Sequence, residues 1–182
     1  TFEVTFDSIE GQPKLNERVT VTGIVMNYAG NAVDGASVHY RVTRKTVFPR
    51  PYYRNYLSYP IHLEREIEIA NGDLVTSSTG TFELQFEGIP DNRIPLKADP
   101  VFIFEVSAVV TDITNEVQSA TTRVKIGQKA AILTFDLPEI IDVNNNESHD
   151  IVATNLNGSL ITIDASVSLY KLIPPTRLLS SR

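Results

Sequence analysis

The sequence Phe82-Glu83-Leu84-Gln85-Phe86-Glu87 alternates strictly between apolar and polar side chains. Successive side chains of a β-strand point to opposite faces of a sheet. The pattern therefore predicts a strand with one face in a core and the other in water. Thr79-Gly80 just before it is typical of a tight turn into the strand.

The same two-residue period recurs along the chain. Residues 36–44 place Ala36, Val38, Tyr40 and Val42 on one face. Residues 101–111 are apolar on both faces, which predicts a central strand covered on both sides. Further strands are expected at residues 19–26, 65–70, 116–126, 131–137, 150–154 and 163–171, separated by turn signals at residues 29–31, 34–35, 71–73, 79–80, 114–115 and 157–158.

These short strands at fairly even spacing, without a helical period, predict an all-β, immunoglobulin-like antiparallel β-sandwich. The strand pattern has a break near Gly127-Gln128-Lys129. About seven strands before the break can close one sandwich, whereas three strands after it bury one face poorly. We therefore expect one domain over residues 1–126 and a second, incomplete sandwich over residues 127–182, which either self-associates through its uncovered strands or leaves that part of the chain partly disordered. The first residue is not Met and the last is Arg182, so we expect a piece of a longer protein.

Composition excludes several classes of function. The chain has no cysteine, which rules out disulfides, thiolate metal sites, cysteine nucleophiles and an internal thioester within these residues. A formal net charge of −6 disfavours nucleic-acid binding, because phosphate contacts need clustered basic residues. No apolar run approaches the length of a membrane helix, and the first residues lack the features of a targeting segment.

Residues 41–60 combine arginine, tyrosine and proline unusually densely. The prolines exclude a regular central strand. Arginine and tyrosine are frequent in the energetic centres of interfaces, but tyrosine also packs well in a core. Two interpretations stay open for the loop 45–60: a partner-binding loop, or a loop folded over its own domain. The candidate contact residues are Arg44, Arg50, Tyr52, Tyr53, Arg54, Tyr56 and Tyr59.

Neither a catalytic nor a tight metal site is predicted. The three histidines, at positions 39, 62 and 149, have no metal-ligand spacing. Asp142, Asn144 and Asn146 match the start of a calcium loop, but Glu147 replaces the required glycine and Ala153 the bidentate glutamate. We interpret this segment as a polar turn, with a weak calcium site at residues 142–150 as the alternative. Nucleophile motifs are absent too, so we expect no enzyme activity and no cofactor.

Four stretches carry a family resemblance. Val21-Thr-Gly-Ile-Val-Met-Asn-Tyr-Ala-Gly-Asn-Ala-Val-Asp-Gly-Ala-Ser-Val-His-Tyr-Arg-Val-Thr-Arg44 is followed by Thr76-Ser-Ser-Thr-Gly-Thr-Phe-Glu-Leu84. Later come Ala153-Thr-Asn-Leu-Asn-Gly158 and Val167-Ser-Leu-Tyr-Lys-Leu-Ile-Pro-Pro175. Together they resemble the macroglobulin-like domains of bacterial alpha-2-macroglobulins. The first two also occur in transthyretin-like and carboxypeptidase-regulatory-like sandwiches.

The resemblance implies a non-catalytic scaffold in a protein that traps proteases outside the cytoplasm, in the periplasm or at the cell surface, with a membrane anchor in the full-length protein. In that family a cleaved bait region triggers closure, and in many members a thioester captures the protease; neither motif occurs here. The implied partners are neighbouring macroglobulin-like domains and, through the full-length protein, proteases. The alternatives are a surface adhesin or glycan-binding sandwich, which the lack of tryptophan disfavours, and an accessory domain of a carboxypeptidase or outer-membrane transporter.

Overall fold

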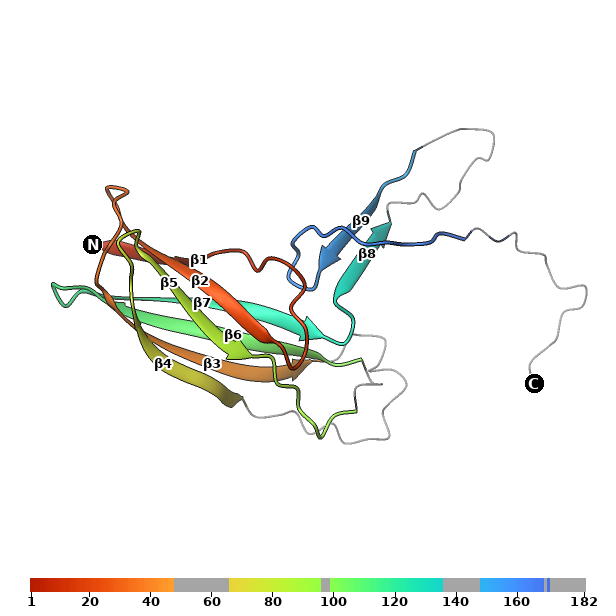
Figure 1. Cartoon of the computed structure of the whole chain (residues 1–182), viewed down its shortest axis with the longest axis horizontal. Helices are drawn as coiled ribbons and strands as arrows, with labels where there is room; N and C mark the ends of the chain where they lie inside the picture. Colours follow the sequence, from red (N-terminus) through yellow and green to blue (C-terminus); the bar gives the residue numbers. More distant parts are fainter. Residues whose placement is uncertain (48–65, 96–98, 136–147, 169, 171–182) are drawn as a thin grey trace, which may run out of the picture.

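The computed structural model describes residues 1–47, 66–95, 99–135, 148–168 and 170, and these form an all-β structure (Figure 1). Within these ranges there is no helix, and hence none long and apolar enough to span a membrane. The described strands are β1 (Phe2–Phe6), β2 (Arg18–Asn27), β3 (Ser37–Val47), β4 (Ile67–Val75), β5 (Thr81–Glu87), β6 (Val101–Thr111), β7 (Val117–Gly127), β8 (Ala131–Phe135) and β9 (Ile151–Asn155).

Strands β1 to β7 form two facing antiparallel sheets. One sheet has the order β1-β2-β5 and the other β4-β3-β6-β7. The remaining two strands, β8 and β9, pair with each other in a ribbon at one end of the sandwich (Figure 1). The all-β antiparallel sandwich expected from the sequence is therefore confirmed.

The core lies between the two sheets and holds the alternating residues that the sequence singles out. Phe82, Leu84 and Phe86 of β5 are buried, and so is Phe104 of β6. The rings of Phe86 and Phe104 lie 5.2 Å apart, so the two sheets meet through aromatic contact. The expectation that these two strands line a single core is confirmed.

Strand β4 corrects one predicted turn. Residues 71–73 carry a strong turn signal, yet they lie inside β4 and pair with β3. Gly72 stands opposite Tyr40, and a Cβ at Gly72 would lie only 2.9 Å from Cε1 of that ring. The glycine thus makes room for a tyrosine of the neighbouring strand, a role that glycine also takes within sheets.

One further expectation holds only in part, and another is wrong over the residues that the structure describes. Strand β6 is central in its sheet, as predicted, but its outer face is not fully covered, because Val109 remains 42% exposed. The expected strand at residues 163–171 is not formed over its described part, residues 163–168 and 170. Between the end of β9 and that segment, the described residues form a single isolated bridge, in which Leu160 pairs with Thr154.

A five-residue turn occurs four times in the part of the chain that the structure describes. In each copy the first residue's N–H donates to the fifth residue's carbonyl, and its side-chain oxygen accepts from the N–H groups of the third and fifth residues. The fourth residue always has positive φ, which favours glycine or asparagine. In the copy that begins at Asp112, a hydrogen bond from the Thr114 hydroxyl lowers the pKa of the Asp112 carboxyl most, and the bonds from the backbone N–H groups of Glu116 and Thr114 lower it further. The copies are Asn27–Asn31, Ser77–Thr81, Asp112–Glu116 and Asn155–Ser159.

Candidate interaction site

The residues expected to contact a partner separate into one described residue and six that lie outside the described ranges. Arg44 is only 5% exposed and points into the sandwich. Its Nη1 donates to the carbonyl of Ile89 at 2.7 Å, and its guanidinium lies 5.9 Å from the ring centre of Phe102. Arg44 is therefore buried within its own sandwich and is not a surface contact. The six others are Arg50, Tyr52, Tyr53, Arg54, Tyr56 and Tyr59.

The described residues offer no cluster of three metal-ligating side chains. His39 is exposed and its Nδ1 lies 2.8 Å from an Asp73 carboxylate oxygen, while His149 is half-buried. His62 and residues 142–147, the start of the calcium-loop candidate, lie outside the described ranges. On the β3–β4 surface, the Thr43 hydroxyl lowers the pKa of Glu66, and the Asn71 amide that of Glu68. Such contacts stabilise exposed carboxylates without gathering them into a reactive group.

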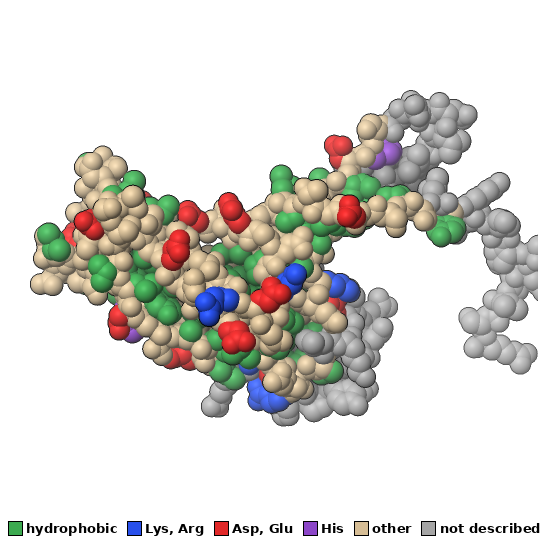
Figure 2. Space-filling view, in the orientation of Figure 1, with side chains coloured by type: hydrophobic (Ala, Val, Ile, Leu, Met, Phe, Trp, Pro, Cys, Tyr) green, Lys and Arg blue, Asp and Glu red, His purple; other side chains and the backbone are tan. Residues whose placement is uncertain are grey.

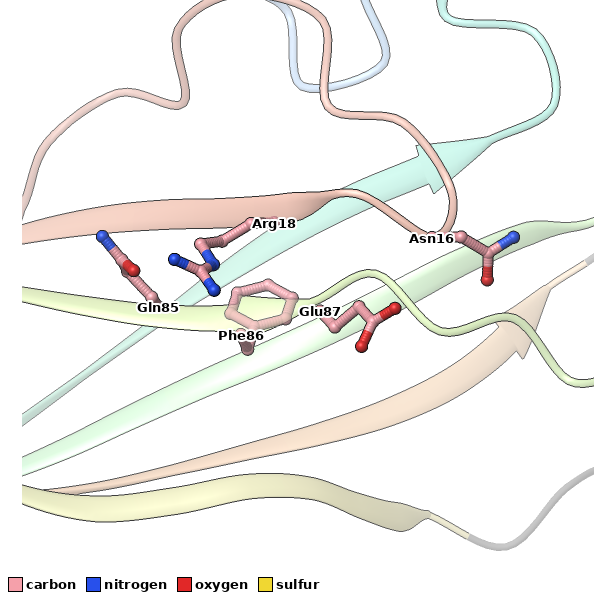
Figure 3. A pocket seen from close by; sticks show the side chains of 5 residues that line it. All are labelled: Asn16, Arg18, Gln85, Phe86 and Glu87. Atoms are coloured by element: carbon pink, nitrogen blue, oxygen red, sulfur yellow. The ribbon is translucent and has the colours of Figure 1, made fainter.

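An open depression of about 650 Å³ lies over the start of β2 and the end of β5 (Figure 3). Arg18 and Glu87 are paired positions on these two neighbouring strands, and Phe86 turns its ring into the core. The polar side chains around the depression are exposed, so they form an ordinary sheet surface. The lining residues are Asn16, Arg18, Gln85, Phe86 and Glu87.

A more specific site lies where the β8–β9 ribbon meets the sandwich. Asn155, at the end of β9, is 1% exposed. Its Nδ2 donates to the carbonyls of Ile9 at 3.1 Å and Gly11 at 2.8 Å, in the connection between β1 and β2. Its Oδ1 accepts from the N–H groups of Asn157 and Ser159. Both donors and both acceptor positions of the amide are thus used, and the ribbon is joined to the sandwich.

The rest of the same turn strengthens this junction. The Asn157 amide pairs with the backbone of Lys125 in β7: its Oδ1 accepts from the N–H at 2.6 Å and its Nδ2 donates to the carbonyl at 3.1 Å. Strand β7 ends the order of its sheet, so the amide occupies a free strand edge. Ser159 Oγ donates to the Ile9 carbonyl at 2.8 Å, and Leu156 packs beside Gly127.

The sequence does not predict this junction. Asn157-Gly158 indicates only a turn, because the partners of that turn lie far away in the chain and are mostly backbone atoms. A usable signal does exist: Asn155 is a polar residue at the inward-facing end of an apolar strand, where an amide must find partners.

Beyond the junction, the ribbon exposes apolar side chains on both faces. Ile132 and Val152 lie on one face, and Leu133, Phe135 and Ile151 on the other, with exposed fractions between 38% and 49%. Figure 2 shows hydrophobic side chains at the surface of the part of the molecule that β8 and β9 form. Two strands cannot cover their own faces, so this ribbon is a second candidate interaction surface.

The ribbon also repeats the beginning of the sandwich. Strands β1 and β2 share five paired positions ending at Phe2 opposite Asn27, and β8 and β9 share five ending at Ala131 opposite Asn155. Each pair is followed by the same five-residue turn and then a single bridge, Met26 to Ala32 or Thr154 to Leu160. Ala-Ser-Val then follows in both copies, at residues 36–38 and 165–167. The ribbon and the turn after it thus repeat the first two strands and the first turn of the sandwich.

The sequence matches no protein-family model and no curated protein. Solved structures with a similar fold include Escherichia coli alpha-2-macroglobulin in its native conformation, with 10% identity, a TM-score of 0.54 and 86% of this chain covered. A mutant Salmonella alpha-2-macroglobulin matches at 11% identity, TM-score 0.53 and 87% coverage. The E. coli protein activated by porcine elastase matches at 11% identity with a TM-score of 0.52, and 85% of this chain is covered. At such identities the likeness shows the fold alone.

The chain spans only a small part of these proteins, namely 11% of the first two and 14% of the third. In the other direction, the matches cover between 85% and 87% of this chain. Because residues 1–127 make up less than three quarters of the chain, a match over 85% or more extends beyond the sandwich.

Proposed function

We propose that this chain is a non-catalytic scaffold segment of an extracytoplasmic, protease-trapping protein of the alpha-2-macroglobulin type. One observation carries the proposal: the match to bacterial alpha-2-macroglobulins runs through the sandwich and on beyond it. An isolated sandwich would suit many unrelated proteins, because this architecture serves many functions. A sandwich followed by the start of a second one suits a chain of successive domains, here residues 1–126 and 127–182. Its partners are then the neighbouring domains and, through the whole protein, a protease.

The first experiment compares this chain with the full-length protein from which it comes. Porcine elastase is a suitable protease, because it activates the E. coli protein that this chain resembles in fold. We expect the full-length protein to retain elastase in a stable complex on a native gel. The 182-residue chain alone should neither hydrolyse casein nor slow elastase. A full-length protein that leaves elastase free, or a chain that cleaves casein unaided, would refute the proposal.

We also propose that the chain self-associates through the β8–β9 ribbon when no further strands cover it. The apolar side chains on both ribbon faces support this, because uncovered strands readily recruit another chain. Light scattering should show species larger than a monomer, and Phe135→Glu with Ile132→Lys should return the chain to a monomer. The matched control is Val109→Lys on the sandwich, where an exposed valine lies apart from the ribbon. A monomeric parent chain would contradict the proposal.

A further inference from the structure

Two of the four recurring turns occupy the same position in the two repeated units. Asn27–Asn31 follows β1 and β2, and Asn155–Ser159 follows β8 and β9. Their hydrogen-bonding patterns within the turn are the same. The second turn, however, is docked on the end of the sandwich that precedes it, through Asn155 and Ser159.

The first turn matches the second at Asn27 but has Ala29 in place of Asn157, so it lacks the second docking amide, and within the described residues nothing is docked on it. Asn27 uses Oδ1 for the N–H groups of Ala29 and Asn31, whereas within the described residues its Nδ2 donates no hydrogen bond. Tyr28, the counterpart of Leu156, is 73% exposed, while Leu156 packs beside Gly127. Asn31, the counterpart of Ser159, keeps a polar side chain at the third docking position.

The position of the first turn also suits docking. It lies with the N-terminus at the end of the sandwich opposite the β8–β9 ribbon (Figure 1). The turn between β6 and β7 lies at the same end and carries Ile113, which is 88% exposed. Apolar side chains at the tips of two turns favour burial against another surface.

We propose that the turn Asn27–Asn31, with Tyr28, is a docking site for the end of another β-sandwich of this kind. The partner offers two backbone carbonyls, as Ile9 and Gly11 do here, to Asn27 Nδ2, and a small residue, as Gly127 is here, to the Tyr28 ring. Each unit thereby inserts its first turn into the end of the unit before it. This inference rests on the proposed function, because it needs a full-length protein with several such units.

The test measures whether the Tyr28 side chain is covered in the full-length protein. Hydroxyl-radical labelling reports side-chain exposure, and the exposed His39 on the side of the sandwich serves as reference. We expect Tyr28 labelling to fall about fivefold between the isolated chain and the full-length protein, since the core of an interface excludes water. Equal labelling in both would overturn the proposal.

The variant N27D separates docking from folding of the turn. A carboxylate closes the same turn at Asp112, so N27D keeps the turn intact and removes only the outward donor. In the full-length protein N27D should restore Tyr28 labelling, and in the isolated chain it should change neither labelling nor thermal unfolding. The matched variant N155D, which loses the donors to Ile9 and Gly11, should expose Leu156 even in the isolated chain. Unchanged protection of Tyr28 in full-length N27D would overturn the proposed role of Asn27.

These results are independent of protease capture. If Tyr28 is covered but elastase is not retained, the docking site stands and the proposed function fails. If elastase is retained but Tyr28 is labelled equally in both proteins, the function stands and the docking site is refuted.

Discussion

Replacing Phe104 with alanine should lower the free energy of unfolding by about 3–5 kcal/mol, because it removes a large side chain from a closely packed core. Phe104 is fully buried in the central strand β6, and its ring contacts Phe86 of the opposite sheet. The substitution therefore leaves a cavity between the two sheets. Urea unfolding followed by circular dichroism measures the effect.

The control for this variant is Ile113→Ala. Ile113 is also apolar and large, but it is 88% exposed at the tip of the β6–β7 turn, so its loss should change the stability of the isolated chain by less than about 0.5 kcal/mol. Equal effects for Phe104→Ala and Ile113→Ala would mean that the core does not lie between these two sheets.

Replacing Gly80 with alanine should lower the free energy of unfolding by about 2–4 kcal/mol, because the variant combines a strained backbone with a steric clash. Gly80 has a φ of +73°, which disfavours any residue with a Cβ. A Cβ there would also collide with the carbonyl oxygen of Val25, a backbone atom held in β2. The backbone at residue 80 cannot shift away from Val25 without loss, because the Gly80 carbonyl accepts a 2.8 Å hydrogen bond from the Val25 N–H.

Gly35→Ala separates these two causes. Gly35 has nearly the same φ, +71°, but a Cβ there would meet no atom within 4 Å. Gly35→Ala should therefore lower the free energy of unfolding by only about 1 kcal/mol, the backbone contribution alone. Thermal unfolding of both variants gives the comparison. If Gly35→Ala destabilises the chain as much as Gly80→Ala, the clash with Val25 makes no contribution.

The sequence predicts most strands of the sandwich, because its period reports which side of a sheet each residue faces. Phe82, Leu84 and Phe86 show this plainly. The same local reasoning fails where the deciding partner is remote in sequence. Gly72 looks like a turn residue until Tyr40 is seen beside it, and the basic residue Arg44 looks like a surface contact until Ile89 and Phe102 are seen around it.

The candidate site was less predictable than the fold. The turn at residues 157–158 could be anticipated, since Asn-Gly is a strong turn signal. Its docking could not, because Asn155 and Asn157 bind backbone groups of Ile9, Gly11 and Lys125, and backbone atoms leave no trace in side-chain patterns. A second sandwich was expected, but the repeated turn and strand register were equally hidden, because the two copies share hydrogen bonds and spacing more than residue types.

The junction at Asn155 has a consequence for biosynthesis. A ribosome makes the chain from its N-terminus, so the carbonyls of Ile9 and Gly11 and the free edge of β7 at Lys125 all exist before Asn155 is added. We therefore expect the first sandwich to fold first and to serve as the template on which the β8–β9 ribbon assembles. The ribbon then meets a finished surface, which shortens its search for the native arrangement and limits pairing between unfinished strands.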